Sequence, residues 1–199
     1  MGVSVIFGSG GGAVYYNGLY NNALGLTIRN CTIASNAAPN GLVGGLGYNT
    51  ASSLYLYSTI IAMNTASNNA APDIRNTSGG SGPALESYNL IGDTTNSMQS
   101  GTTVITNGLP NANGSYVGNS GTAQGVVNPR LLPLAYNGGS TPTMALQAGS
   151  LAINAGSNPG NIPYDQRGSS YNRVVGSQAD IGAFEFGAGP PTGLIIYLY

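Results

Sequence analysis

Two stretches of this chain decide its fold: Gly25–Ala38, which reads GLTIRNCTIASNAA, and Ser53–Ala66, which reads SLYLYSTIIAMNTA. They align without a gap at a spacing of 28 residues, and the aligned positions include identical pairs such as Leu26 with Leu54. At the start of each copy, leucine or isoleucine occupies every second position, which is the period of a strand with one buried face. The alignment therefore predicts two copies of one strand-forming repeat.

A glycine-rich lead precedes each copy. GGGAVYYN closes at Asn17 and VGGLGYN closes at Asn49, so both leads end in Tyr-Asn. One strand and its turns cannot bury an apolar face alone, whereas stacked repeats bury it as a continuous column. The sequence thus predicts an all-β solenoid, a parallel β-helix, with residues 1–127 as its coils.

Stacked repeats place identical positions above one another. Asn36 then lies over Asn64, and the two side chains form a candidate asparagine ladder that satisfies amide groups between coils. The competing interpretation is that two surface turns share asparagine because it is a good turn residue.

Later segments of the coil region are less regular. Residues 88–92 (YNLIG) and 102–106 (TTVIT) are predicted as short strands between turn residues. Residues 107–125 are rich in Gly, Asn and Ser and are predicted as a loop.

The composition changes from Asn128 onward, where prolines become frequent. We interpret residues 128–186 as an irregular closing block of the same domain. Within it, residues 144–156 have weak helical character and predict one or two helical turns. Residues 187–199 are interpreted as a linker followed by an apolar terminal strand.

Composition excludes several classes of function. Only 6% of the residues are charged, the net charge is −1, and the five basic residues are all arginine. This is not the basic footprint of a nucleic-acid-binding protein. No apolar run reaches the ~18 residues that suggest a membrane span. The single cysteine, Cys31, excludes an intramolecular disulfide.

Three motifs carry a family resemblance. Asn137-Gly138-Gly139, Asp165-Gln166-Arg167-Gly168 and Asp180-Ile181-Gly182-Ala183-Phe184-Glu185 follow one another in the closing block. In this order they resemble the choice-of-anchor Q domain, and the coils resemble repeats of the polymorphic outer membrane protein type. The resemblance covers about Gly10 to Phe186. It implies a right-handed, pectin-lyase-like parallel β-helix that is exported to the cell surface or the extracellular space.

The resemblance implies no activity, and the sequence departs from the family at two positions. Met144 stands where relatives often carry His, and Asn154 stands where Asp is common. An enzyme of this fold needs paired carboxylates or a base beside an acidic cluster. The six acids are scattered, and there is no histidine. We therefore expect no catalytic residues, no metal site and no cofactor.

The charged motifs of the closing block have two interpretations. Arg167 is expected to pair with a carboxylate such as Asp180 or Glu185, and so to pin an irregular loop to the end of the stack. Alternatively, the segment from Asp165 to Gly168 binds a ligand or an ion. We favour the structural role for all four charged residues.

Aromatic and glycosylation positions give further candidate surfaces. Tyr55 and Tyr57 alternate with leucines, so they should point outward and form a contact face for glycan or protein. Asn76 and Asn113 lie in Asn-X-Ser/Thr sequences, and we expect both in loops where they could be glycosylated.

The two ends of the stack are the candidate surfaces for self-association. A β-helix has open ends with unpaired backbone groups. The segment LIIYLY should either fold back along its own stack or add to a neighbour's sheet; it comprises Leu194, Ile195, Ile196, Tyr197, Leu198 and Tyr199. Head-to-tail addition would build a fibre. The expected function is a non-catalytic, self-associating structural protein; the alternatives are a glycan-binding adhesin and, less favoured, a polysaccharide lyase or hydrolase.

Overall fold

The computed structural model describes residues 12–16, 25–49, 54–67, 70–79, 82–99 and 105–190. These residues form short strands and turns and contain no helix. The strands are β1 (Val14–Tyr16), β2 (Leu26–Arg29), β3 (Thr32–Ala34), β4 (Ala37–Ala38), β5 (Leu46–Tyr48), β6 (Leu54–Tyr57), β7 (Ile60–Ala62), β8 (Thr65–Ala66), β9 (Ile74–Asn76), β10 (Leu85–Ser87), β11 (Leu90–Ile91) and β12 (Tyr116–Val117). The prediction of an all-β fold is confirmed for the residues that the structure describes.

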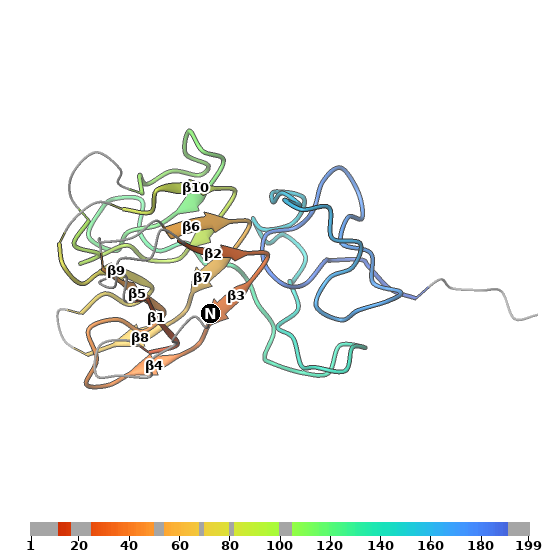
Figure 1. Cartoon of the computed structure of the whole chain (residues 1–199), viewed down its shortest axis with the longest axis horizontal. Coiled ribbons are helices and arrows are strands. Elements are labelled where there is room, and N and C mark those ends of the chain that lie inside the picture. Colours follow the sequence, from red (N-terminus) through yellow and green to blue (C-terminus); the bar gives the residue numbers. More distant parts are fainter. Residues whose placement is uncertain are drawn as a thin grey trace, which may run out of the picture.

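The strands stack as parallel neighbours in four sheets (Figure 1). Sheet A has the order β1-β5-β9, sheet B has β10-β6-β2, sheet C has β12-β11-β7-β3, and sheet D has β4-β8. Leu26 pairs with Leu54, and Ile33 pairs with Ile61, as the repeat predicted. Parallel strands in stacked sheets, one repeat above the next, are compatible with a solenoid.

The same corner recurs between sheets B and C. Asn30, Ser58 and Tyr88 occupy it in successive repeats, with φ of 50°, 49° and 54°. A positive φ turns the backbone sharply, and asparagine accepts it better than most residues. The corner therefore separates two strands of one repeat with hardly any intervening loop.

Sheet C is buried on both faces. Ile33, Ile61 and Ile91 point inward and pack with Leu54 and other residues of sheets A and B. The residues between them point outward and pack against the closing block. These outward residues are Ile60, Ala62 and Leu90, and their apolar partners include Leu131, Leu146, Ala152, Ile181 and Phe184. The closing block thus covers the side of sheet C, and the expectation that it sits on the end of the stack is wrong.

Backbone hydrogen bonds fix the closing block to the sheet. The Gly182 amide donates to the Ser58 carbonyl at 2.9 Å, and the Ala183 amide donates to Thr32 Oγ1 at 3.1 Å. A Cβ on Gly182 would lie 2.8 Å from Ile60 Cδ1, and φ at Gly182 is +103°. Only glycine suits this position, because it combines a positive φ with a close approach.

Two local predictions are wrong. Residues 107–125 are not simply a loop, because β12 lies within them and pairs with β11. Residues 144–156 form no helix: Leu146 bridges to Leu131 in an antiparallel pair, and Gly149 and Asn154 both have positive φ. Of the predicted strand 102–106, only residues 105 and 106 are described, and they are not in a strand.

Candidate functional site

The charged motifs of the closing block form one buried network. Arg167 makes an ion pair with Asp165, with Nη2 2.7 Å from Oδ2. The expected pairing of Arg167 with the Asp180 or Glu185 carboxylate is not what the structure shows. A tight turn explains this, because Asp165 Oδ1 also accepts the Arg167 amide at 2.8 Å and so brings the two side chains together. Glu185 contributes its carbonyl, which accepts from Arg167 Nη2 at 2.7 Å.

The Arg167 guanidinium lies between two aromatic rings. Its Cζ is 4.2 Å from the centroid of Tyr171 and 3.8 Å from that of Phe184. Such cation–π contacts strengthen when the cation is removed from water, and Arg167 is buried. Arg167 therefore has a structural role: its buried guanidinium connects separate loops of the closing block.

Glu185 and Asp180 hold backbone amides. Glu185 Oε1 accepts from the Val175 amide at 2.8 Å, and Oε2 accepts from the Asp180 amide at 2.9 Å. Asp180 in turn accepts from the amides of Asn154 and Phe186. Burial raises the pKa of Glu185 to about 7, despite these hydrogen bonds. Both carboxylates organise loops that have no regular secondary structure.

The acids of the coil region have the same role. Asp73 Oδ1 accepts from the Asn64 amide at 3.0 Å, and Oδ2 accepts from the Asp93 amide at 2.7 Å. Burial raises the pKa of Asp73 to about 6. Asp93 Oδ1 accepts the amides of Thr95 and Ser120 at 2.8 and 3.0 Å.

Glu86 binds side chains of the neighbouring repeat. Its Oε1 accepts from Asn113 Nδ2 at 2.8 Å, and its Oε2 accepts from the Ser115 hydroxyl at 2.5 Å. All six acids of the chain lie in the described residues, and each accepts hydrogen bonds that hold a turn or a loop. Within the described part of the chain, no group of three His, Cys, Asp or Glu side chains is placed to bind a metal.

Asn36 and Asn64 stack as a ladder. Asn36 Nδ2 donates to Asn64 Oδ1 at 2.9 Å, and Asn64 Nδ2 donates to Asp73 Oδ1 at 2.8 Å. Asn64 Oδ1 also accepts the Asn36 amide at 3.0 Å. The contact runs between successive repeats, and a carboxylate extends it.

A second ladder follows the corner between sheets B and C, and sequence reasoning missed it. The Cys31 amide donates to Thr59 Oγ1 at 3.4 Å, the Thr59 amide to Asn89 Oδ1 at 3.0 Å, and the Asn89 amide to Ser115 Oγ at 2.9 Å. Three different side chains, those of Thr, Asn and Ser, accept the hydrogen bond in this column, so no repeated residue identity reveals it. The signal in the sequence was position: Cys31, Thr59 and Asn89 each directly follow a corner residue.

Other predicted surface residues have the following places. Tyr55 and Tyr57 are half-buried on β6 and alternate with the buried Leu54 and Leu56. Asn76 is not in a loop; it is buried in β9, and its Oδ1 accepts from Ser78. Asn113 is exposed, but its amide nitrogen binds Glu86. Residues 194–199 lie outside the described residues.

One end of the stack consists of edge strands. Each of β1, β2, β3 and β4 has a described neighbour on one side only. Val14, Leu26 and Ile28 belong to these strands, and they pack on the core while remaining half-buried. They line an apolar hollow of about 330 Å³. Among the described residues, this open end therefore has strand edges without a neighbouring strand, together with half-buried apolar side chains.

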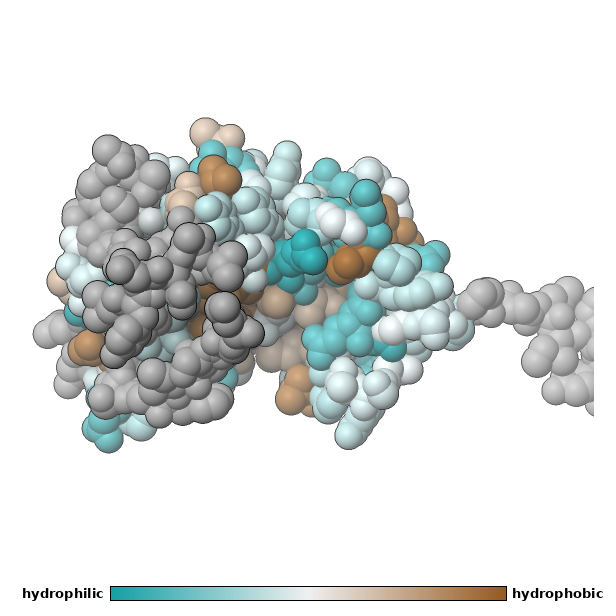
Figure 2. Space-filling model, in the orientation of Figure 1, coloured by the Kyte–Doolittle hydropathy of each residue, from teal (hydrophilic) through white to brown (hydrophobic). Residues whose placement is uncertain are grey.

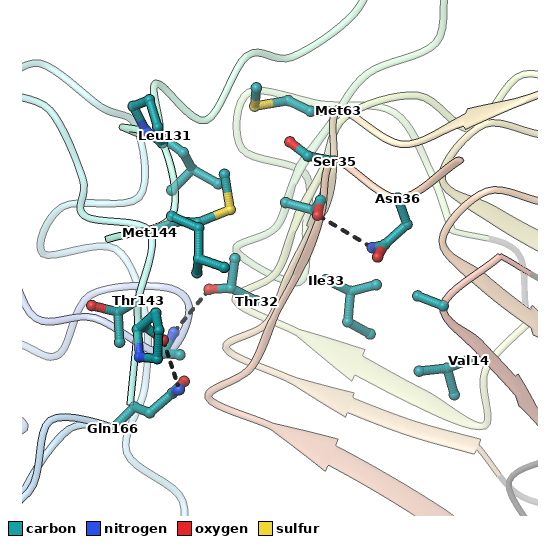
Figure 3. A pocket seen from close by; sticks show the side chains of 16 residues that line it. Val14, Thr32, Ile33, Ser35, Asn36, Met63, Leu131, Thr143, Met144 and Gln166 are labelled. Carbon is teal, nitrogen blue, oxygen red and sulfur yellow. Dashed lines mark hydrogen bonds between the residues drawn. The ribbon is translucent and has the colours of Figure 1, made fainter. Parts of the chain in front are cut away.

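A larger groove lies between this end and the closing block. Its volume is about 850 Å³, and Figure 3 shows β3 and Val14 on one side, with Leu131, Met144 and Gln166 on the other. In the space-filling view, apolar residues line the hollow between the two parts (Figure 2). None of the residues that line the groove is charged.

No family model, curated protein or solved structure matches this chain. No helix among the described residues has the length and apolar character needed to cross a membrane.

Proposed function

We propose that this chain is a non-catalytic structural protein, a right-handed parallel β-helix that is secreted or displayed on a cell surface and associates with copies of itself. The observation that carries the proposal is the open end, where β1 to β4 are all edge strands among the strands that the structure describes. Secretion is inferred from the low charge and from the resemblance of the closing-block motifs to the choice-of-anchor Q domain. The β-helix accounts for the recurring corner and for the two ladders.

The use of the carboxylates supports a non-catalytic role. A glycoside hydrolase needs one carboxylate to donate a proton and a second to act as base or nucleophile. In this chain all six acids accept hydrogen bonds that organise turns and loops, and five of them hold backbone amides. None lines the large groove. A raised pKa at Glu185 and Asp73 follows from burial inside the fold and not from position in a cleft.

The open end supports self-association. An edge strand offers unpaired amides and carbonyls to another strand. Natural proteins block such edges with charge or proline, and β1, β3 and β4 carry neither, while Arg29 ends β2. A contact between unlike ends does not close on itself and produces an extended chain of subunits.

Sedimentation velocity over a wide range of concentrations tests this function. We expect species larger than the monomer that increase with concentration, and short filaments in electron microscopy. Replacement of Ile28 by lysine places a charge in the open end and should reduce association, whereas the same change at the exposed Val126, which lies in no strand, should not. A chain that stays monomeric at every concentration contradicts the proposal.

Glycan binding is the second candidate, and the outer face of β6 favours it. Tyr55 and Tyr57 lie two residues apart on one strand and are half-buried, so their rings are partly accessible on the outer face. Aromatic rings on a flat sheet can stack against sugars. A glycan array should give binders that are lost when both tyrosines become alanine. An array with no binders removes this candidate.

A further inference from the structure

We infer that the groove beside β3 is the docking site for the segment Leu194–Tyr199 of a second copy, which adds to sheet C as an extended strand. This rests on the proposed self-association and specifies how it occurs. The occupant is a six-residue apolar segment of the same sequence, LIIYLY.

The groove straddles the edge of β3 that has no neighbour among the described strands. Thr32 and Ala34 line it from the outer face of sheet C, and Ile33 lines it from the inner face. Side chains of one strand point alternately to opposite faces, so a groove that contacts both faces must pass along the strand's edge. On its other side β3 pairs with β7. An extended segment in the groove would therefore extend sheet C by strand addition, in which main-chain hydrogen bonds supply affinity and alternate side chains supply specificity.

Both walls of the groove are apolar. Val14 and Ile33 form the wall on the core side, and the closing block contributes the wall opposite, through Leu131, Pro133, Leu134, Pro142 and Met144. A strand bound between them would contact apolar side chains on both of its faces, which favours apolar side chains on both faces of the strand. Leu194–Tyr199 has this pattern, because all six of its residues are aliphatic or aromatic.

The length of the segment and its lack of charge also match the groove. Residues 32–36 line the groove in succession; β3 offers three of them as strand positions before the positive φ of Ser35 ends the strand, so part of a six-residue segment can pair there. The lining residues and the segment both lack charged side chains. A charged or amphipathic strand would place polar groups against apolar walls without partners.

The place where the described chain ends favours a second copy as the source. The end of the described chain, at the blue end of the colour scale, leaves the closing block on the side away from β3 (Figure 1). Only residues 191–193 separate this point from Leu194, and the four residue steps from 190 to 194 span at most about 14 Å. A strand that leaves one copy on this side is placed to enter the groove of the next copy, head to tail.

Two variants with complementary defects test this inference. The first lacks residues 194–199 but keeps the groove. The second carries Leu134→Asp, which places a charge in the groove wall but keeps the segment; Leu134 is 66% exposed, so the change should not disturb the core. Val126→Asp is the matched control, because Val126 is 57% exposed and does not line the groove. Leu134→Ser is a milder second groove variant, and circular dichroism checks that each variant is folded.

In sedimentation, each complementary variant alone should be monomeric, with association weakened by about a hundredfold or more, and the Val126→Asp control should assemble like the parent. An equimolar mixture of the two variants should form a one-to-one dimer, because one supplies a groove and the other a segment. If both variants still assemble, or if their mixture stays monomeric, the docking site is wrong while self-association by another route stands. If the parent chain itself is monomeric, both proposals fail.

Discussion

Replacement of Arg167 by methionine should lower the free energy of unfolding by about 3–5 kcal/mol, the usual cost of removing one partner of a buried ion pair. Asp165 would remain buried without its cation, and the Glu185 carbonyl would lose its donor. The rings of Tyr171 and Phe184 would keep an apolar partner, since methionine packs well against aromatics. Urea denaturation followed by circular dichroism measures the loss.

Two further variants show whether the loss comes from the ion pair. Arg130→Met removes an exposed arginine and should change stability by no more than about 0.5 kcal/mol. The double variant Asp165→Asn with Arg167→Met should cost less than the sum of the two single changes, by roughly 1–3 kcal/mol, because the charge left unpaired in the single variant is gone. If Arg167→Met and Arg130→Met lower the free energy of unfolding equally, Arg167 does not stabilise the closing block.

The repeat was predictable because stacking imposes equivalence on residues 28 apart. Leu26 lies beside Leu54, and Asn36 beside Asn64, since each position in a stacked sheet meets its own counterpart. The second ladder was not found, because threonine, asparagine and serine can each accept the same amide hydrogen bond. A search for identical residues in successive repeats fails where a position requires only a side chain that can accept a hydrogen bond.

The position of the closing block was missed, although the sequence contained a signal for it. Strand β6 alternates, with leucines inward and tyrosines outward, whereas β7 reads Ile60-Ile61-Ala62 without a polar break. A continuous apolar run indicates a strand that is buried on both faces. Something must therefore cover the outer face of sheet C, and the closing block does so. The groove was beyond sequence reasoning, because one wall comes from the first strands and the other from the closing block, which are far apart in the sequence.

Two buried carboxyls should make the protein more stable at pH 5 than at pH 8. Burial raises the pKa of Glu185 from 4.5 to about 7 and that of Asp73 from 3.8 to about 6. The folded state therefore keeps protons that the unfolded chain has already released, so stability falls as the pH rises from about 4 to about 7. Each shift corresponds to a loss on the order of 3 kcal/mol once the pH exceeds the folded pKa.

Below pH 4 the opposite effect takes over. Burial alone would raise the pKa of Asp93, but hydrogen bonds from Ser120 and Thr95 outweigh it and hold the pKa below 3.8. The stability that this ionised carboxylate provides is present above its unfolded pKa and is lost as the pH falls through the folded pKa. Stability should therefore be greatest near pH 4–5, which thermal melts at pH 3, 5 and 8 would locate.

The variant Glu185→Gln separates titration from structural damage. Glutamine cannot accept both the Val175 and Asp180 amides as the carboxylate does, so the variant should be less stable at every pH. Because it no longer titrates, the decline in melting temperature between pH 5 and pH 8 should be clearly smaller than that of the parent, and Asp73 and Asp180, whose pKa values burial also raises, account for the remainder. A parent chain whose melting temperature rises over this interval would mean that backbone hydrogen bonds, and not burial, dominate both sites.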